Sequence, residues 1–520
     1  MAAPEPWLGL HPYRVRRPAG SGIHAGIMTG CLDACVLEVV LAQPPQTLPA
    51  RLQMAFTLMA HIILVPLGVA LPFITLVMNY LGLRRDDRTA LTLARRWSMV
   101  MAIQFAVGVV SGTILSFEFG LLWPGLMGTW GGVFGTGFGI EAWAFFLEAI
   151  LLSIYLYGWR RLPPWTHFWF GVPLPAVALL GAFGILAANA WMHSPRGFRL
   201  NAAGEPTDVD VWRVLFTPML GPQYWHFILA AYMAAGFGVA SVYAVGWLRG
   251  RRDRYHKLGF TVPFTVGAIA APVQIVVGDI IARATFHEQP VKYAAMALVW
   301  RTDTYVPEYV FGWLQPEGTV SGGPRIPWLN SMLAGFTPDT RVQGLTSVPA
   351  SERPSPALAT LVHTAFDVMV IIGFLLLALA AWFAIAWLRG SRDPSSGTRR
   401  RHDLPRSAWF FRCAAACGVA AVIALEAGWI TTEVGRQPWV VYGHLKVADA
   451  VTRSVSAAAI WTSFAVIVLI YTAIAFVTIL CRLRTEWRKA DAEAGVTEPA
   501  ERLPVPAEES DIPYGPREEP

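Results

Sequence analysis

The stretch TTEVGRQPWVVYGHLKVADAVT, residues 431–452, begins where an apolar run at residues 409–430 ends, and it places Glu433 and Arg436 directly beside that run. The run has about the twenty residues that a helix needs to cross roughly 30 Å of hydrocarbon. An ionisable group at this depth is unfavourable unless it is paired, hydrated or bound to a cation. The stretch therefore predicts a membrane-spanning helix that ends in a functional site.

The composition extends this prediction to the whole chain. Of the 520 residues, 54% are apolar and only 15% are charged, which excludes an ordinary soluble multidomain protein. Nine mainly apolar stretches of about twenty residues can span a bilayer, at residues 54–80, 97–117, 140–157, 168–191, 227–247, 260–281, 365–387, 409–430 and 457–480. We expect an all-α integral membrane protein, a bundle of about nine transmembrane helices with one long outer loop.

The charge pattern predicts how this bundle is oriented. The net charge of +6 does not indicate nucleic-acid binding, because Lys and Arg cluster in alternate short loops, as the positive-inside rule describes. These clusters follow the first, third, fifth and seventh predicted spans, at residues 84–96, 160–161, 249–257 and 389–406. We therefore expect these loops and the C-terminus in the cytoplasm, with the N-terminal side of the first span outside.

The chain divides into three parts. Residues 1–50 form an N-terminal extension of unknown role, and residues 51–485 form the membrane domain. Within that domain, residues 282–364 are a long polar insertion on the outer side, too long to be a simple connector. Residues 486–520 are rich in Glu and Pro, which predicts a disordered cytoplasmic tail.

Candidate ligands and proton carriers lie inside the predicted spans, all in the outer half of the bilayer: His61, Glu141, Glu148, His226, Met369 and Glu433. Glu141 and Glu148 begin the third span from outside and, seven residues apart, share one helical face. Glu118 and His193 are expected at the membrane interface, and Glu426 is a candidate partner for a buried group.

Each of these residues also has a structural interpretation. An intramembrane His can form a hydrogen bond between helices, a Met can fill the core, and a carboxylate can be a structural partner or a proton carrier. Their clustering favours haem, since His and Met are usual axial ligands in helical bundles. A His–Met pair suits a low-spin, electron-transferring haem, whereas an iron with a single protein ligand keeps a position open for oxygen. Carboxylates on a neighbouring helix can then deliver protons.

Several sequence motifs surround these residues. They are ARLQMAFTLMAHIILVPL around His61, FEFGLLW, GIEAWAFFLEA around Glu141 and Glu148, LAANAWMHSPRGF, HFILAAY from His226, GD with a later QPVKYAAM, FDVMV around Met369, and EAGW before GRQPW. Together they resemble subunit I of cytochrome bd-type quinol oxidases, over about residues 50–485. Nine helices with a long outer loop is also the plan of this family.

The resemblance implies a set of haem ligands. His226 and Met369 would be the axial pair of a low-spin haem b. His61 and Glu433 would serve a high-spin haem b and a third haem, either haem d or a b-type replacement, without an individual assignment.

The resemblance also implies catalytic roles outside the ligand set. Glu141 and Glu148 would deliver protons, and Lys292 would belong to the quinol-oxidising loop. The remaining residues of the family motif would hold haem propionates or lie on the electron path, since an arginine binds carboxylates bidentately; they are Arg436, Gln437 and Trp439.

The implied activity is that of a terminal oxidase. It would oxidise ubiquinol or menaquinol at the outer face, reduce molecular oxygen to water with cytoplasmic protons, and generate membrane potential without pumping. The implied partners are a second, haem-free subunit (subunit II) and membrane lipid, with no nucleic acid. The implied location is the inner (plasma) membrane of a bacterial cell, as a multi-pass protein.

Three positions depart from the family pattern. Ala297 stands where a Glu often follows the loop lysine, Asp367 reverses a charge in the FRxM pattern, and Ser116 replaces a Glu before the FQFG-like motif. The short outer loop resembles the cyanide-insensitive branch. Two alternatives therefore remain open: a haem-binding paralogue with a different electron donor, and a haem-free, proton-coupled transporter that uses the intramembrane Glu residues as carriers.

Overall fold

A computed structural model describes residues 43–392, 399–400 and 404–477. The expectations for residues 1–42 of the N-terminal extension and for the tail at residues 486–520 lie outside this range.

Among the described residues, nine helical spans are long and apolar enough to cross a membrane, which confirms the predicted fold class. They are α2 (Thr47–Arg85), α3 (Arg88–Leu122), α4 (Pro124–Gly158), α5 with α6 (Pro164–Gly171 and Pro173–His193), α8 (Leu220–Leu248), α9 (Arg254–Glu288), α12 (Pro356–Arg389), α13 (Ala408–Val434) and α15 (Ala457–Ala475). Each corresponds to one predicted span, and α5 and α6 together form the fourth.

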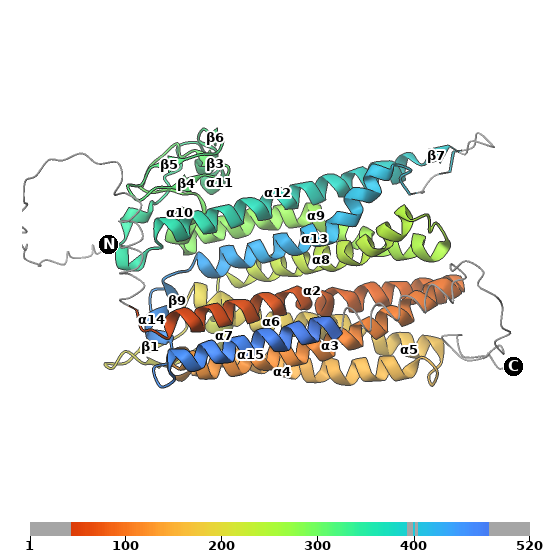
Figure 1. The fold of residues 1–520 in the computed structure, drawn as a ribbon, viewed down its shortest axis with the longest axis horizontal. Coiled ribbons are helices and arrows are strands. Elements are labelled where there is room, and N and C mark those ends of the chain that lie inside the picture. Colours follow the sequence, from red (N-terminus) through yellow and green to blue (C-terminus); the bar gives the residue numbers. More distant parts are fainter. Residues whose placement is uncertain (1–42, 393–398, 401–403, 478–520) are drawn as a thin grey trace, which may run out of the picture. The chain divides into compact units, whose positions relative to one another are not determined.

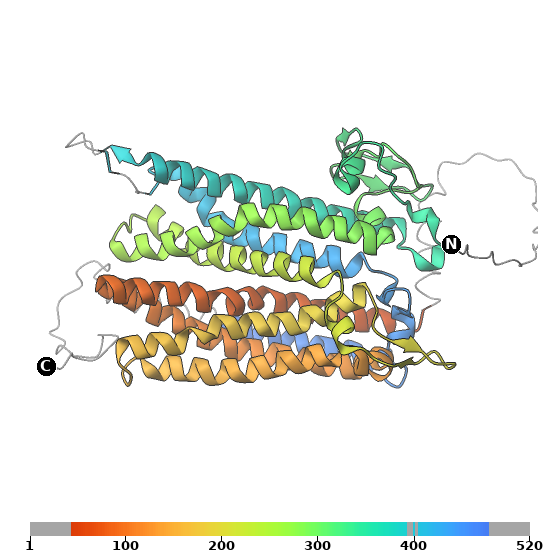
Figure 2. The ribbon, with the colours of Figure 1, turned by 180° about the vertical axis from the view of Figure 1, so that it is seen from behind.

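The spans pack into two neighbouring groups (Figures 1 and 2). In the first group, α2 packs against α3 and α6, and α4 packs against α3 and α6. In the second group, α8 packs against α9 and α13, and α12 packs against the same two helices. Helix α2 also contacts α8 and so joins the groups, while α15 lies against α2.

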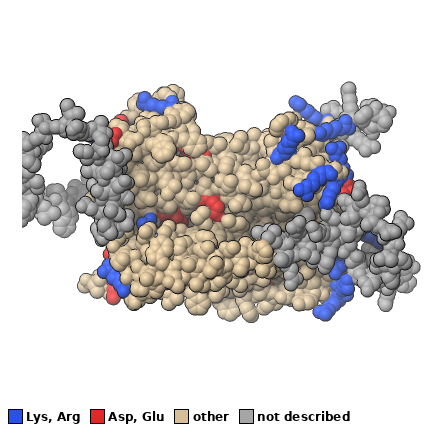
Figure 3. Space-filling model, viewed as in Figure 1, with Lys and Arg blue, Asp and Glu red and all other residues tan. Residues whose placement is uncertain are grey.

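The two ends of this bundle differ in chemistry. The "loop end" carries α10, α11 and strands β3 to β6, and the opposite, "basic end" carries the short connections α2–α3 and α8–α9 (Figure 1). Lys and Arg side chains gather at the basic end in Figure 3. Asp87 links the α2–α3 connection to the α8–α9 connection. Its carboxylate caps α3 by accepting the backbone N–H groups of Thr89 and Ala90, and it forms an ion pair with Arg254 at 2.5 Å.

The connection between α9 and α12, residues 289–355, folds into a "cap" at the loop end. It contains α10 (Pro290–Met296), β3 (Glu308–Tyr309) paired with β6 (Arg325–Ile326), β4 (Trp313–Leu314) paired with β5 (Val320–Ser321), α11 (Leu329–Gly335), and 3-10 turns η1 (Leu345–Ser347) and η2 (Ala350–Glu352). Its apolar side chains, including Leu298 and Leu345, form a common core with Val362 of α12. The insertion is therefore shorter than residues 282–364, because both flanking helices extend into it.

The other short elements lie at the helix ends. They are β1 (Arg199–Leu200) paired with β2 (Pro206–Thr207), α7 (Val211–Leu215), β7 (Ser391–Arg392) paired with β8 (Arg399–Arg400), β9 (Trp439–Val441) paired with β10 (Leu445–Lys446), and α14 (Val447–Ala450). Strands β1 and β9 lie at the loop end in Figure 1, and β7 lies at the basic end.

Helix α4 starts earlier than the predicted third span, at Pro124 instead of residue 140. Glu141 therefore lies near the middle of α4, and Glu148 lies in the half that leads to the basic end, so the prediction that both begin the span at its outer side is wrong. The missed segment is rich in glycine, which lowers helix propensity. It is helical because glycine permits close packing: a Cβ on Gly137 would lie 2.6 Å from the carbonyl oxygen of Gly184 in α6.

Candidate functional site

A polar cluster at the loop end joins three segments that are distant in sequence. We call its four side chains the Glu433 cluster: His193 from α6, Lys292 from α10, and Glu433 and Arg436 from the end of α13 and the turn after it. Arg436 Nη2 donates to Glu433 Oε2 at 2.6 Å, and Asn189 Nδ2 donates to Glu433 Oε1 at 2.8 Å. Both carboxylate oxygens of Glu433 are therefore held in place.

Lys292 reaches this cluster from the cap. Only 5% of Lys292 is exposed, and its Nζ donates to the carbonyl oxygen of Thr432 at 3.1 Å. Burial lowers the pKa of Lys292 to about 7; the charge of Glu433 opposes this shift, and that of Arg436 adds to it. The structure thus brings together the predicted residue of the outer loop and the predicted ligand Glu433.

In the Glu433 cluster, the guanidinium of Arg436 has a donor that no described residue uses. Arg436 is 6% exposed, and its Nε has no hydrogen-bond partner among the described residues. A buried guanidinium donor without an acceptor is unfavourable, and an anionic group is the partner that guanidinium binds best. The cluster therefore suits a carboxylate-bearing ligand.

His193 is part of the cluster and is the last residue of α6, at the end of the fourth span. Its side chain is fully buried, with Nδ1 2.8 Å from the carbonyl oxygen of Asn189 and 3.3 Å from Arg436 Nη1. Its backbone carbonyl accepts Gln289 Nε2 at 3.0 Å. In the sequence, His193 stands out only by its position at the end of a predicted span. Its partner Arg436 follows 243 residues later in the chain, and the sequence pattern does not indicate this contact.

The other two motif residues have different surroundings. Gln437 is partly buried and donates its backbone N–H to Val434 at 3.0 Å. Trp439 pairs with Lys446 across β9 and β10, and its ring lies 5.2 Å from Lys446 Nζ. In the described part of the chain, neither side chain forms a hydrogen bond with the Glu433 cluster.

His226 and Met369 lie in the second helix group, and a glycine faces each of them. His226 comes from α8, where its ring nitrogens lie 3.3 and 3.4 Å from Gln274 Nε2 of α9. A Cβ on Gly278 of α9 would lie 3.6 Å from the His226 ring, and one on Gly428 of α13 would lie 3.0 Å from Met369 Sδ. Glycine at these positions lets the backbones of α9 and α13 lie close to the two candidate ligands.

His61 lies in the first helix group, against α3. Ser111 Oγ donates its single proton to the carbonyl oxygen of Gly108 at 3.0 Å, and it lies 2.8 Å from His61 Nδ1. With its proton on the Gly108 carbonyl oxygen, the hydroxyl accepts the Nδ1–H of His61, and in that tautomer Nε2 keeps the lone pair that binds a metal. A Cβ on Gly112 would lie 3.5 Å from the His61 ring.

The carboxylates of the first group fall into two kinds. Glu141 and Glu148 are partly buried on α4 and form no hydrogen bond with His61 in the described part of the chain. Glu118 lies near the end of α3, is 4% exposed, and accepts Gln53 Nε2 and Thr57 Oγ1, each at 2.9 Å. Helix packing against α2 buries it.

The structure shows the environment of each of the three residues that depart from the family pattern. Ser116 is exposed and donates to the carbonyl oxygen of Gly112, so the buried carboxylate in this region is Glu118. Ala297 is buried directly after α10. Asp367 accepts the backbone N–H of Phe311 in the cap at 2.6 Å.

Glu426, one of the candidate partners, is buried on α13. Neither of its carboxylate oxygens has a hydrogen-bond partner among the described residues. An unpartnered carboxylate in an apolar bundle is unfavourable, which supports its expected role as a partner for a buried group.

Comparisons with known proteins agree along most of the chain. The model of a family described as cytochrome bd terminal oxidase subunit I matches residues 49–489. A Bacillus subtilis (strain 168) protein, provisionally named cytochrome bd menaquinol oxidase subunit I, is 32% identical over 427 residues, which are 80% of this chain and 91% of that protein. The cytochrome bd ubiquinol oxidase subunit 1 of the same strain is 28% identical over 416 residues, 78% of this chain and 86% of that protein.

The helical arrangement also has a solved counterpart. The structure of bd oxidase from Geobacillus thermodenitrificans matches with a TM-score of 0.77 and 32% identity, over 85% of this chain and 98% of that one. The sequence comparisons and the structural comparison therefore both identify cytochrome bd oxidases as similar proteins.

Proposed function

The chain belongs to the cytochrome bd terminal oxidase subunit I family, and from this premise we propose how its residues oxidise quinol and support oxygen reduction. It is the haem-bearing subunit of a quinol oxidase and crosses the membrane several times. The observation that carries the proposal is the Glu433 cluster, where Lys292 of the cap meets the end of α13 inside the protein. Quinol oxidation belongs on the cap side of this cluster and haem on the bundle side.

The residues of the second helix group fit a low-spin haem b. His226 and Met369 would supply the axial nitrogen and sulfur, a ligand pair that favours electron transfer. The glycines at 278 and 428 support this assignment, because a Cβ at either position would stand next to a ligand side chain. Haem, when bound, supplies the one-electron redox steps and the iron that binds oxygen.

His61 and Glu433 would serve the two remaining haems, a high-spin haem b and a haem d or its b-type replacement. Ser111 holds His61 in the tautomer that leaves Nε2 available, which is the usual role of a residue behind a metal-bound histidine. Glu433 is held by Asn189 and Arg436 in the same way. The partnerless Nε of Arg436 fits a haem propionate, with Gln437 and Trp439 nearby on the same motif.

Quinol would bind at the loop end beside α10. The Lys292 amine would donate a hydrogen bond to a quinol oxygen in place of the Thr432 carbonyl that it now contacts. The two relatives from Bacillus subtilis are named for menaquinol and ubiquinol respectively, and we propose that one of these two quinols is the donor.

Glu141 and Glu148 would carry protons from the opposite side. They lie in the middle of α4 and further toward the basic end, and both are partly buried, so they would form steps along this helix. Protons taken up there, and protons released by quinol at the loop end, would separate charge across the membrane without a pump.

The surroundings of the subunit follow from its surface. Lys and Arg gather at the basic end (Figure 3), so this end would face the cytoplasm of a bacterial cell and the cap would face outward. The N-terminal side of α2 would also lie outside, in the inner (plasma) membrane. A second, haem-free subunit and lipid would cover large exposed apolar side chains such as Trp143, Phe146 and Val276.

The structure weakens both alternatives. A transporter needs no haem, whereas the family to which the chain belongs is that of a cytochrome. The paralogue was suggested by the altered outer loop, where Ala297 replaces a Glu, and by the charge reversal at Asp367. The Asp367 carboxylate accepts a backbone N–H of the cap. The negative charge at position 367 therefore stabilises the contact between α12 and the cap, and by itself it does not indicate a different electron donor.

Quinol-driven oxygen consumption by the purified two-subunit complex tests this proposal. Lys292→Met should raise the quinol KM about tenfold, which corresponds to roughly 1.4 kcal/mol of lost binding. Haem content should not change. Arg325→Gln, in an exposed strand of the same cap, is the matched control and should leave KM as it is. An unchanged KM in Lys292→Met would move the quinol site away from α10, and a wild-type complex without quinol-driven oxygen uptake would refute the function.

A further inference from the structure

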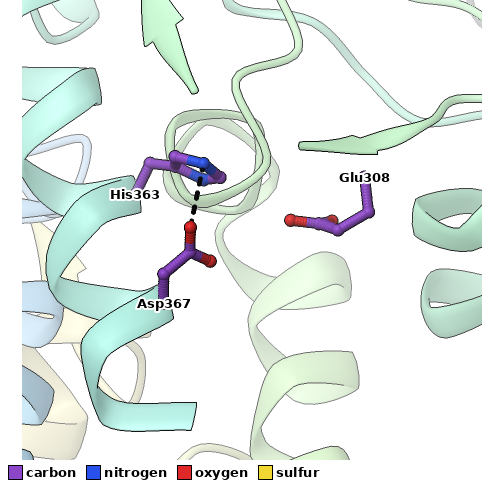
Figure 4. Close-up of side chains that lie close together, drawn as sticks. All are labelled: Glu308, His363 and Asp367. Carbon is purple, nitrogen blue, oxygen red and sulfur yellow. Dashed lines mark ion pairs between the residues drawn. The ribbon is translucent and has the colours of Figure 1, made fainter. Parts of the chain in front are cut away.

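Three potential metal ligands that the haem and quinol sites do not use meet between the cap and α12. They are Glu308 of β3 and, one helical turn apart on α12, His363 and Asp367. One ligand atom from each lies within 4.8 Å of the other two. Figure 4 shows the three side chains pointing toward a common space, with the His363–Asp367 contact dashed.

We propose that Glu308, His363 and Asp367 bind a divalent cation of the zinc class, which fastens the cap to α12.

His363 is oriented as a ligand. It is fully buried, and its Nδ1 lies 2.7 Å from the carbonyl oxygen of Met296, which can only accept a hydrogen bond. Nδ1 therefore carries a proton, and the backbone N–H of Gly312 donates toward Nε2 at 3.3 Å. The single lone pair of Nε2 accepts this N–H, so a cation bound at Nε2 would take the place of the Gly312 contact. A backbone carbonyl bound to the other ring nitrogen is typical of metal-binding histidines.

The two carboxylates are supported in the same manner. Asp367 Oδ2 accepts the N–H of Phe311 at 2.6 Å, and Glu308 Oε2 accepts Nδ2 of the buried Asn330 at 2.6 Å. Each carboxylate has a second oxygen, and each oxygen has two lone pairs, so both retain capacity for a cation. Hydrogen-bonded carboxylates of this kind keep their orientation when they bind a metal.

Asp367 Oδ2 lies 3.3 Å from Nε2 of His363, an imidazole that is neutral when Nε2 carries no proton. Two carboxylates lie here, and in the described part of the chain neither forms an ion pair with a Lys or Arg. A divalent cation would supply the missing positive charge.

The geometry and atom types select the class of cation. His363 Nε2 and Asp367 Oδ2 are 3.3 Å apart, which is about the edge of a tetrahedron with metal–ligand bonds of about 2.0 Å. One imidazole nitrogen and two carboxylate oxygens suit Zn²⁺, with water as a fourth ligand. Ca²⁺ and Mg²⁺ prefer sites made of oxygen alone.

A cation here would connect the two proposed active regions. The Met296 carbonyl that orients His363 ends α10, which carries Lys292, and Asp367 precedes Met369 by two residues on α12. Occupancy would hold the cap on α12 and keep α10 in place. This effect on quinol oxidation rests on the proposed function, whereas cation binding itself does not.

The test is zinc binding to the purified two-subunit complex. After treatment with a chelator and its removal, Zn²⁺ is titrated against a chromophoric zinc indicator, and bound zinc is counted by mass spectrometry of the metal. We expect one zinc per wild-type complex that is lost in His363→Ala and weakened at least about tenfold in Glu308→Gln and Asp367→Asn, which preserve shape. Glu317→Gln, an exposed carboxylate in the same cap, is the matched control and should bind like the wild type.

Limited proteolysis gives a second measure that needs no turnover. Zinc should protect the cap of the wild type and of Glu317→Gln, but not that of the three ligand variants. Unchanged haem spectra in the isosteric variants would show that they fold. Wild-type protein that binds no zinc, or ligand variants that bind it as tightly as the wild type, would overturn the proposal while leaving the oxidase function standing.

Discussion

Ser111 shows how a single residue prepares a haem ligand. Its hydroxyl lies within hydrogen-bond distance of both the carbonyl oxygen of Gly108 and the Nδ1 of His61, and this contact orients the ring so that Nε2 points away from Ser111. The sequence identifies His61 as a candidate, since it is a polar residue inside an apolar span. It does not identify Ser111, because serine inside a helix commonly bonds only its own backbone.

Ser111→Ala should weaken the binding of the haem at His61 about tenfold, in the range typical of residues behind a metal ligand. The measurement is haem content together with the reduced absorption spectrum of the purified complex. Ser116→Ala is the matched control, because Ser116 lies on the same helix, also bonds a backbone carbonyl, and is exposed. Equal haem content and spectra in the two variants would contradict the role of Ser111.

Glu148 tests the proton route. Glu148→Gln keeps the shape of the side chain but cannot exchange a proton, so turnover should fall about a hundredfold, as for the loss of a proton-transfer group. Haem content should be intact, since Glu148 is not one of the proposed ligands. Glu205→Gln, an exposed carboxylate at the loop end, should retain full turnover. Full turnover in Glu148→Gln would end the proton-carrier interpretation.

At the scale of helices, hydropathy predicted every span, because about twenty apolar residues have few alternatives to a transmembrane helix. It failed at α4, where the glycine-rich segment before residue 140 resembles a loop in sequence but packs as a helix against α6. It also did not predict the partners of Glu118 and His193. Their partners come from other helices, such as Gln53 for Glu118 and Arg436 for His193, and a linear pattern does not contain that information.

The contact between α4 and α6 can be tested at Gly137. A methyl group there would lie 2.6 Å from the backbone carbonyl oxygen of Gly184, and backbone cannot move aside as a flexible side chain can. Gly137→Ala should therefore destabilise the complex by about 1–3 kcal/mol, as overpacking usually does. The measurement is the thermal unfolding midpoint in detergent. Gly135→Ala on the same helix, where the added methyl would meet nothing within 4 Å, should leave the midpoint unchanged. Equal midpoints for both variants would show that α4 and α6 do not need this close approach.

At the scale of the whole molecule, the two ends of the bundle separate two chemistries. The loop end holds the cap, Lys292 and the Glu433 cluster, and the basic end holds the arginine-rich connections (Figures 1 and 3). The candidate site could be predicted from the sequence only as a set of residue types at membrane depth. That Lys292 lies against Glu433, and that Glu308 meets His363 and Asp367, depends on how the cap folds, because these residues are brought together over long separations in sequence.

The central claim is that this bundle holds haem on His226 and Met369 in a protein that also binds oxygen. The most direct measurement is a reduced-minus-oxidised absorption spectrum of membranes that contain this chain and its second subunit, before and after carbon monoxide, for the wild type and for His226→Ala. We predict a low-spin b-haem signal together with a separate band that responds to carbon monoxide, and only the first should disappear in His226→Ala. Wild-type membranes without a haem signal, or a low-spin signal that survives in His226→Ala, would contradict the account.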